Sequence, residues 1–332
     1  MGKQISVIGA GSWGTALASV LAANGHQVTI WSIDEAEVAM LNQHHEQVVK
    51  LSGVILPESV TATADLQEAI EGKEFLVFAV PSVFVRSTAR KAAAFVKEGQ
   101  IIVNVAKGIE EATLMTLVEI IEEEIPVANV CVLSGPSHAE EVGKKLPTTV
   151  VVGAHDQKIA YLVQDVFMNN VFRVYSNDDV IGIELGGSLK NVIALAAGIC
   201  DGLGFGDNTK AALMTRGIAE LSRLGVAMGG KMETFMGLSG IGDLIVTCSS
   251  VHSRNRRAGV LIGQGKTTQE AMDEVQQVVE GVYSAKAALA LGKHYGLELP
   301  IVEQINAVLF DGKKPIDAVE DLLLRDRKAE RD

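Results

Sequence analysis

The sequence predicts an α/β domain built on a doubly wound sheet, followed by a second domain made only of helices. Through the first half of the chain, short β-branched runs alternate with longer helical patterns, which is typical of a parallel sheet wrapped by helices. Beyond residue 178, every long apolar pattern has helical spacing. Because 332 residues also exceed what one hydrophobic core usually serves, we expect two domains, residues 1–178 and residues 179–332.

The individual elements follow from the spacing of apolar residues. The predicted strands are Ile5–Ile8, Gln27–Trp31, Phe75–Val80, Ile101–Val105, Val130–Leu133, Thr149–Val152 and Val171–Val174. The predicted helices between them are Thr15–Ala23, Glu35–His44, Val83–Phe95, Leu114–Glu123 and Lys158–Phe167. Those of the second domain are Ile183–Ala197, Lys210–Gly225, Thr268–Val275, Ser284–Tyr295, Ile301–Phe310 and Pro315–Leu324.

The composition argues against several classes of protein. The chain is 48% hydrophobic and 21% charged, which is ordinary for a folded globular protein. Its net charge of −12 disfavours nucleic acid and anionic membranes as partners, because both repel an acidic surface. Three separated cysteines and seven histidines without ligand spacing predict no disulfide framework and no metal site. No apolar run approaches the roughly 20 residues that span a bilayer, so we expect a cytoplasmic protein without stable membrane insertion.

A GxGxxG motif, Gly9-Ala10-Gly11-Ser12-Trp13-Gly14, lies near the N-terminus. Alone the pattern is weak, but here it follows a predicted strand, opens a predicted helix and precedes a second strand. Gly9 makes the tight turn, Gly11 lets the backbone approach a pyrophosphate, and Gly14 allows the helix to pack closely on the strand. The helix N-terminus offers free N–H groups to the phosphates. We therefore predict a Rossmann-type domain that binds a dinucleotide.

Two other segments follow predicted strands at the same edge of the sheet, where ligands of such sheets bind. Val80-Pro81-Ser82 ends one strand, because proline stops strand pairing. Lys107 follows the next strand and places an ammonium group at this edge. A lysine in such a place either serves a ligand or is simply solvated, and its position alone leaves both alternatives open.

Lys190 is the only charged residue between Leu185 and Cys200. It lies beside an apolar helical face, and the preceding Gly186 and Gly187 allow a backbone or a ligand to come close. In such surroundings a lysine loses hydration, which lowers its pKa and makes it a usable proton donor and acceptor. The alternative is a side chain that reaches out to solvent from an amphipathic helix.

The densest basic run of this acidic chain is Ser253-Arg254-Asn255-Arg256-Arg257. Arginine forks with short hydroxyl and amide donors suit a phosphate dianion, although a solvent-exposed helix start would have the same composition. Upstream, a glycine-rich turn carries Asp243, whose carboxylate could face a hydroxyl or an ammonium group.

Together these segments resemble the NAD(P)-dependent glycerol-3-phosphate dehydrogenases of the bacterial type, and the resemblance runs essentially from end to end. Seven motifs occur in order with family-like spacing: Gly9–Gly14, Ala106–Glu110, Ser134–Ala139, Leu189–Asn191, Gly240–Leu244, Ser253–Asn255 and Val278–Gly281. The resemblance implies reversible reduction of dihydroxyacetone phosphate to sn-glycerol 3-phosphate, which supplies the backbone of phospholipids. It further implies that Lys190 transfers the proton.

The resemblance also implies a role for each matching position. The implied substrate contacts are Lys107, Gly135, Ser137, Lys190, Asp243, Ser253, Arg254 and Asn255. The implied cofactor contacts outside the glycines are Ser12, Trp13, Lys107, Ala139, Arg254, Val278 and Glu280.

The segment Trp31-Ser32-Ile33-Asp34 bears on coenzyme choice. Many relatives carry histidine or arginine at the position of Ile33, beside the adenosine ribose, whereas no cation follows here until Lys50. Asp34 falls about where Rossmann proteins place the acidic residue that accepts hydrogen bonds from a free 2′-hydroxyl. A carboxylate there repels a 2′-phosphate, so we expect NAD(H) or NADP(H) with NAD(H) favoured, while Ser32 leaves dual use open.

Two other functions stay open on the sequence alone. One is a dehydrogenase of another hydroxy acid with the same two-domain plan. The other is a dinucleotide sensor without catalysis, against which an isolated Lys190 argues because a sensor does not need it. The helical domain has enough apolar surface for a homodimer, without proving one.

Overall fold

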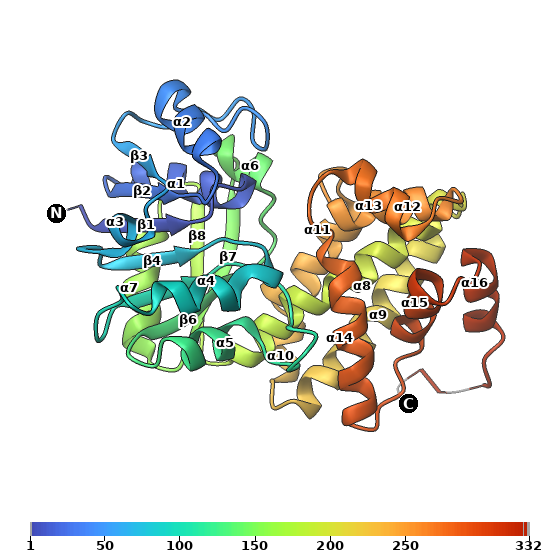
Figure 1. Cartoon of the computed structure of the whole chain (residues 1–332). Coiled ribbons are helices and arrows are strands. Elements are labelled where there is room, and N and C mark those ends of the chain that lie inside the picture. Colours follow the sequence, from blue (N-terminus) through green and yellow to red (C-terminus); the bar gives the residue numbers. More distant parts are fainter. Residues whose placement is uncertain (1, 328, 331–332) are drawn as a thin grey trace.

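The computed structural model describes residues 2–327 and 329–330. Figure 1 shows two parts that lie side by side, a sheet part coloured blue to green and a helical part coloured yellow to red. The sheet part ends with a strand at Asn177, and the first helix of the helical part begins at Val180. This confirms the predicted fold class, whereas the division into domains at residue 178 stays a prediction.

One sheet of eight strands forms the core of the sheet part, in the order β3-β2-β1-β4-β5-β6-β7-β8. All neighbouring strands are parallel except β6 and β7. The order reverses between β1 and β4, so the loops after these two strands border the crevice where dinucleotides bind in such folds. The strands are β1 (Gln4–Ile8), β2 (Gln27–Trp31), β3 (Val60–Thr63), β4 (Phe75–Phe78), β5 (Ile101–Asn104), β6 (Asn129–Ser134), β7 (Thr148–Ala154) and β8 (Phe172–Asn177).

The seven predicted strands are all present, with ends shifted by up to three residues. Strand β3 was not predicted, because four residues at the sheet edge are too short to show an alternation. The helices of this part are α1 (Ser12–Ala23), α2 (Glu35–His44), α3 (Leu66–Ile70), α4 (Val85–Ala92), α5 (Leu117–Glu124), α6 (Ala139–Gly143) and α7 (Gln157–Phe167). The predicted helix Val83–Phe95 is instead a 3-10 turn, Ser82–Phe84, followed by α4.

The helical part is arranged around α8 (Val180–Gly202), which is buried along almost its whole length. The other helices are α9 (Asp207–Ala227), α10 (Met232–Phe235), α11 (Asp243–Ser249), α12 (Arg254–Gly263), α13 (Thr268–Val275), α14 (Glu280–His294), α15 (Pro300–Phe310) and α16 (Pro315–Leu323), with a π turn at Leu238–Gly242. Helices α10, α11 and α12 were not predicted.

Helix α8 corrects the expectation that no segment is long enough to cross a bilayer. It has 23 residues and a mean hydropathy of 1.4 over its most apolar window, but 94% of that window is buried inside the protein. A helix that is apolar on all sides and covered on all sides is a core helix.

Helices α8 and α12 approach each other through four glycines. A Cβ on Gly198 would overlap the carbonyl oxygen of Arg256, and one on Gly259 would overlap that of Leu195. Gly202 and Gly263 repeat this contact one turn further along. The same glycines weaken the helical signal in the sequence, which is why α12 was missed. The close contact brings the N-terminus of α12 beside the middle of α8.

We expect Gly259→Ala to lower the free energy of unfolding by about 1–3 kcal/mol, because an added methyl group forces two backbones apart. Gly206→Ala is the matched control, since its backbone has an ordinary φ of −89° and no atom lies within 4 Å of an added Cβ. Urea unfolding of both variants measures the difference. Equal midpoints would show that the α8–α12 contact is not tight.

Candidate functional site

The loop between β1 and α1 has the shape that a pyrophosphate requires. Gly9 adopts a φ of +126°, and a Cβ there would lie 2.8 Å from the carbonyl carbon of Ala79, so the turn requires glycine. A Cβ on Gly14 would overlap the carbonyl oxygen of Gly9. Gly11 faces open space, and no side chain caps α1 after it. The first N–H groups of α1 are therefore left for an anion, and the loop fits a dinucleotide.

Three of the implied cofactor contacts lie next to this loop. Ser12 and Trp13 are the first two residues of α1, and both are partly buried. Ala139 opens α6, which packs against α1. Ala139 is far from Ser12 and Trp13 in the sequence, yet the fold brings its helix against the helix that carries them.

Two implied residues follow β2, at some distance in the chain from the glycine loop. Ile33 is 75% exposed. Asp34 is also exposed, and its Oδ1 accepts a hydrogen bond from the N–H of Ala36, 2.9 Å away, so that it caps α2. Helix capping thus accounts for one of the two carboxylate oxygens of Asp34, a role that the sequence analysis did not consider.

A second carboxylate, that of Glu37, lies closer to the glycine loop. Its oxygens accept hydrogen bonds from Ser32 Oγ at 2.7 Å and from Gln47 Nε2 at 3.4 Å, and it forms an ion pair with Lys50. Gln47 Nε2 also donates to the carbonyl oxygen of Ala10 at 2.9 Å, inside the glycine motif. Sequence reasoning missed Glu37, because its link to the loop runs through a residue ten positions away.

The most buried group of charges is the triad Lys107, Asp243 and Lys190. Lys190 Nζ donates to Asp243 Oδ1 at 2.9 Å, and Lys107 Nζ donates to Asp243 Oδ2 at 2.6 Å. Lys107 also donates to the carbonyl oxygen of Gly135 at 3.1 Å. Lys107 comes from the loop after β5, Lys190 from α8 and Asp243 from the start of α11. Four residues that the resemblance assigns to the substrate are therefore joined directly.

The burial of Lys190 decides between the two alternatives for its side chain. It is only 5% exposed, so the solvent-exposed alternative is wrong. Burial, followed by the charge of Lys107, lowers the pKa of Lys190 to about 8 against the opposing effect of Asp243. Burial alone would raise the pKa of Asp243, but the two ammonium groups outweigh it and hold that pKa below its usual value. The triad therefore holds a carboxylate beside a lysine that can change its protonation near neutral pH.

Thr247 completes the surroundings of Lys190 and was missed from the sequence. Its Oγ1 accepts from Lys190 Nζ at 2.5 Å and donates to the carbonyl oxygen of Asp243 at 2.6 Å. Thr247 lies four residues after Asp243 on α11, so the two side chains share one helix face. A prediction of α11 would have revealed this pair.

Two segments packed closely against α8 explain why two glycines lie shortly before Lys190. A Cβ on Gly186 would lie 2.9 Å from the carbonyl oxygen of Ser239, and one on Gly187 would lie 2.6 Å from Ser134 Oγ. The π turn before α11 and the end of β6 thus press against α8 at this point. Gly186 thus allows another backbone to approach, as predicted, and Gly187 leaves room for the side chain of Ser134.

The basic run divides into residues with different roles. Ser253 Oγ caps α12 by accepting from the N–H of Arg256, whose guanidinium forms an ion pair with Asp201 at 2.7 Å. Arg257 is exposed. Arg254 is partly buried and forms no hydrogen bond or ion pair with any residue among 2–327 and 329–330. Arg257 likewise forms none within the described residues, so partial burial is what distinguishes Arg254, whose charge acts on the neighbouring Glu280. Arg254 is therefore the arginine best placed for a ligand at this helix start.

Asn255 is tied into the fold rather than free. Its Nδ2 donates to Asn191 Oδ1 at 2.9 Å, and its Oδ1 accepts from the N–H of Gly281 at 2.8 Å. Asn191 is the neighbour of Lys190 on α8, so Asn255 fixes the starts of α12 and α14 beside that lysine.

The remaining implied residues lie along the boundary of the two parts. Ser137 Oγ donates to the carbonyl oxygen of Gly135 at 2.9 Å, within the loop that also receives Lys107. Glu280, the first residue of α14, accepts hydrogen bonds from the N–H of Ser82 at 3.1 Å and from its Oγ. Burial raises the pKa of Glu280. Val278 is partly buried two residues before α14.

Comparison with known proteins gives the family. The model for the N-terminus of NAD-dependent glycerol-3-phosphate dehydrogenase matches residues 4–160, and the model for its C-terminus matches residues 179–320. The glycerol-3-phosphate dehydrogenase [NAD(P)+] of Agathobacter rectalis is 65% identical over 99% of this chain and 98% of its own length, and that of Fusobacterium nucleatum is 58% identical over 98% of each.

A solved structure agrees with the sequence relatives. The crystal structure of glycerol-3-phosphate dehydrogenase from Coxiella burnetii covers 98% of this chain and 99% of its own, with 37% identity and a TM-score of 0.94. Both family models, the near-complete coverage and the shared fold lead to one conclusion. The chain belongs to the NAD-dependent glycerol-3-phosphate dehydrogenase family.

Proposed function

We infer that this protein catalyses the reversible reduction of dihydroxyacetone phosphate to sn-glycerol 3-phosphate with NAD(H) or NADP(H). The observation that carries this proposal is the buried triad of Lys107, Asp243 and Lys190. It is supported by Arg254 on the neighbouring helix α12, which forms no hydrogen bond or ion pair with the residues that the structure describes. The triad suits the reduction of a ketone, and the arginine suits its phosphate group. A bound nicotinamide supplies or accepts the hydride.

Lys190 is proposed as the proton donor to the ketone oxygen. During reduction, negative charge develops on that oxygen, and a positioned ammonium group both stabilises the charge and delivers the proton. In the reverse direction the neutral amine accepts the proton. With a pKa of about 8, Lys190 can exist in both forms near neutral pH, as a group that acts in both directions requires.

Asp243 and Thr247 orient Lys190 and do not take part in proton transfer. Each accepts a hydrogen bond from Nζ, at 2.9 and 2.5 Å, which leaves one ammonium N–H to point at a substrate. Lys107 lies on the other side of Asp243 and adds a second positive charge near the site. We assign it to the substrate, as the family resemblance implies.

The proposed phosphate ligands are Arg254 and its neighbours Ser253 and Asn255 at the start of α12. Ser253 accepts a hydrogen bond from Arg256 and keeps its hydroxyl proton, and Asn255 Nδ2 keeps a second N–H beside the one given to Asn191. An arginine fork pairs well with a phosphate dianion, and the helix N-terminus adds a positive dipole end. Binding energy from the phosphate, remote from the reacting carbon, would hold the ketone in place for reaction.

The cellular setting is part of the proposal. A product of this kind supplies the backbone of phospholipids, and we expect the protein in the cytoplasm, acting on a small-molecule substrate without membrane insertion. A homodimer formed through the helical part also stays a prediction, for which analytical ultracentrifugation is the direct measurement.

We predict that the protein oxidises NADH or NADPH with dihydroxyacetone phosphate and much more slowly with dihydroxyacetone. Arg254→Met removes this cation, so it should lower kcat/KM for the phosphate ester by an amount that corresponds to about 2–5 kcal/mol. The loss with dihydroxyacetone should be smaller, because that ketone has no phosphate and only the implied cofactor contact of Arg254 is lost. Loss of nicotinamide absorbance measures both rates.

Arg257→Met is the matched control for this experiment, because Arg257 belongs to the same run but is exposed. Equal effects of the two variants would make the run a solvated surface. Equal rates of the wild type with both ketones would exclude a phosphate ester as the substrate. Dinucleotide binding without turnover of either ketone would favour the sensor.

We predict that Lys190→Met binds the dinucleotide but loses about 10²–10⁴-fold in kcat, the range that general acid–base catalysis supplies. In the wild type, reduction requires the ammonium form, so its rate should fall as the pH rises through about 8. Oxidation requires the amine and should rise over the same interval. Steady-state pH profiles in both directions measure this, and profiles of the same slope sign would remove Lys190 from proton transfer.

We predict that NADH is preferred over NADPH, because the carboxylates Asp34 and Glu37 follow β2, where we expect the adenosine ribose, and Lys50 is already paired with Glu37. Ile33→Arg should raise kcat/KM for NADPH, since Ile33 is exposed and an arginine there can meet a 2′-phosphate. Glu37→Gln should act in the same direction by releasing Lys50. A wild type that favours NADPH, or variants without gain, would contradict this assignment.

A further inference from the structure

The loop that carries Lys107 joins β5 to α5 and is held at both of its ends. At its start, Asn104 exchanges hydrogen bonds with the backbone of Ala106. At its end, Ile109 pairs with Thr116, and Thr116 caps α5. Lys107 lies between these two points, so the loop's position sets how far its ammonium group reaches toward Asp243.

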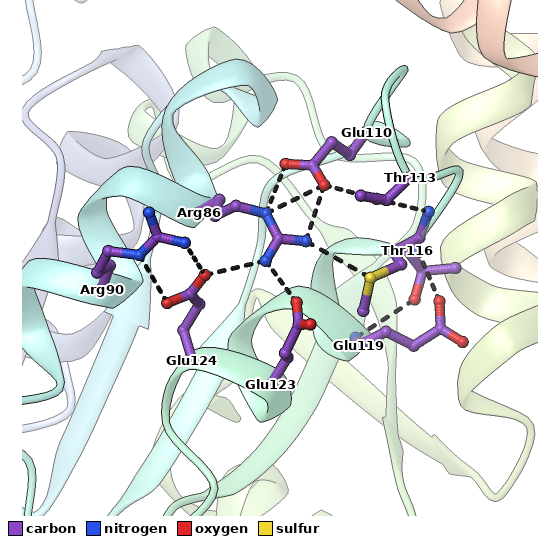
Figure 2. A network of polar contacts seen from close by, with 9 residues as sticks. Arg86, Arg90, Glu110, Thr113, Thr116, Glu119, Glu123 and Glu124 are labelled. Carbon is purple, nitrogen blue, oxygen red and sulfur yellow. Dashed lines mark hydrogen bonds and ion pairs between the residues drawn. The ribbon is translucent and has the colours of Figure 1, made fainter.

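A single guanidinium, that of Arg86 on α4, holds this loop from the side (Figure 2). Its Nε lies 2.8 and 3.1 Å from the two carboxylate oxygens of Glu110, and its Nη2 lies 2.8 Å from Oε2. Nη1 donates to Glu123 and, at 2.9 Å, to Glu124, both on α5. Arg86 thus joins the loop, α4 and α5 at one point.

The carboxylates around Arg86 depend on its positive charge, which no neighbouring cation among the described residues supplies to Glu110. Three carboxylates meet two guanidinium groups, and the second, Arg90, donates its hydrogen bonds to Glu124. The side chain of Arg86 is 21% exposed, whereas that of Arg90 is 68% exposed. Hydrogen bonds from Arg86 are the main cause of the lowered pKa of Glu110. Without Arg86, Glu110 would face two like charges with no cation of its own.

The loop that carries Lys107 also contacts α8 of the helical part and Ser82 in the loop after β4. Ser188 Oγ of α8 donates to the carbonyl oxygen of Gly108 at 3.1 Å. A Cβ on Gly108 would overlap Ser82, the residue that binds Glu280 of α14. Ser82 also lies four residues before Arg86, on the turn that leads into α4. Arg86 therefore fixes the loops after β4 and β5 relative to each other.

We propose that Arg86 is a positioning residue for the reaction: through Glu110 it holds the loop in which Lys107 reaches Asp243. The proposal rests on the proposed function. It goes beyond it by assigning a role to a side chain that contacts neither Lys107 nor Asp243 directly. Glu110 lies three residues after Lys107, so a shift of Glu110 moves the lysine as well.

Loss of the contacts between Arg86 and Glu110 should change the pKa of Lys190, which a general loss of stability would not do. The charge of Lys107 is one cause of the lowered pKa of Lys190. When Lys107 withdraws, that repulsion ends and Asp243 is left to Lys190 alone, so both changes raise the pKa. Cys248 and His138 also interact with Lys190, but neither belongs to the loop that carries Lys107.

The test compares Arg86→Met with Arg90→Met, which removes the same charge but leaves Glu110 paired. For Arg86→Met we expect kcat/KM for dihydroxyacetone phosphate to fall roughly 10- to 100-fold, as for misplacement of a reacting group by about 1 Å. The pH at which reduction declines should rise, as it should in Lys107→Met. For Arg90→Met, kcat/KM and the pH profile should stay within about twofold of wild type.

A second variant guards against misfolding. Glu110→Gln keeps the size of the side chain and the contacts of Arg86 with α5, and it should show the same shift in the pH profile. If Arg86→Met and Glu110→Gln match Arg90→Met in kcat/KM and in pH profile, the positioning role is wrong. If instead the wild type fails to reduce dihydroxyacetone phosphate, the proposed function itself fails, a result that is separate from any difference among the variants.

Discussion

The carboxylate of Asp243 is the group on which the rest of the site depends. It lies between two ammonium groups that arrive from different parts of the fold, Lys107 after β5 and Lys190 on α8. An isolated buried charge costs several kcal/mol, so Asp243 is stable there only because both cations reach it. Two cations and one anion leave one net positive charge, which is the sign that a developing alkoxide needs.

The packing of α8 against its neighbours determines where Lys190 lies relative to this carboxylate. Glycines on α8 and α12 let the two helices touch backbone to backbone, and this brings Asn255 to Asn191, next to Lys190. Glycines 186 and 187 likewise admit the segments that carry Ser239 and Ser134. On these sides α8 is held by close contacts that only glycine allows. On its other sides large apolar side chains such as Leu189 and Ile193 pack in the core of the helical part, and both kinds of contact fix the place of Lys190.

Local signals predicted most of the fold and part of the site. The glycine loop and the flanking strands are visible in the sequence because their residues are adjacent and periodic. Lys190 can also be predicted from the sequence, because it is the one charged residue in a long apolar stretch. Thr247 and Glu37 were not predicted, because their roles depend on contacts between residues that are distant in the sequence. Helix α12 was not predicted, because it contains glycines that serve helix packing and weaken the helical pattern. In the sequence Arg86 resembles an ordinary surface residue, and only the fold brings Glu110, Glu123 and Glu124 to it.

The glycine contact between α8 and α12 also limits how the chain can vary. At Gly198, Gly202, Gly259 and Gly263 an added methyl group meets backbone atoms of the facing helix, and no rotamer can relieve such an overlap. A change at one position cannot be offset by trimming a neighbour, because the neighbour is already glycine or main chain. We therefore expect divergence in this protein to collect in loops and on exposed helix faces, while these four positions accept no substitution without a shift of the helix that carries Arg254.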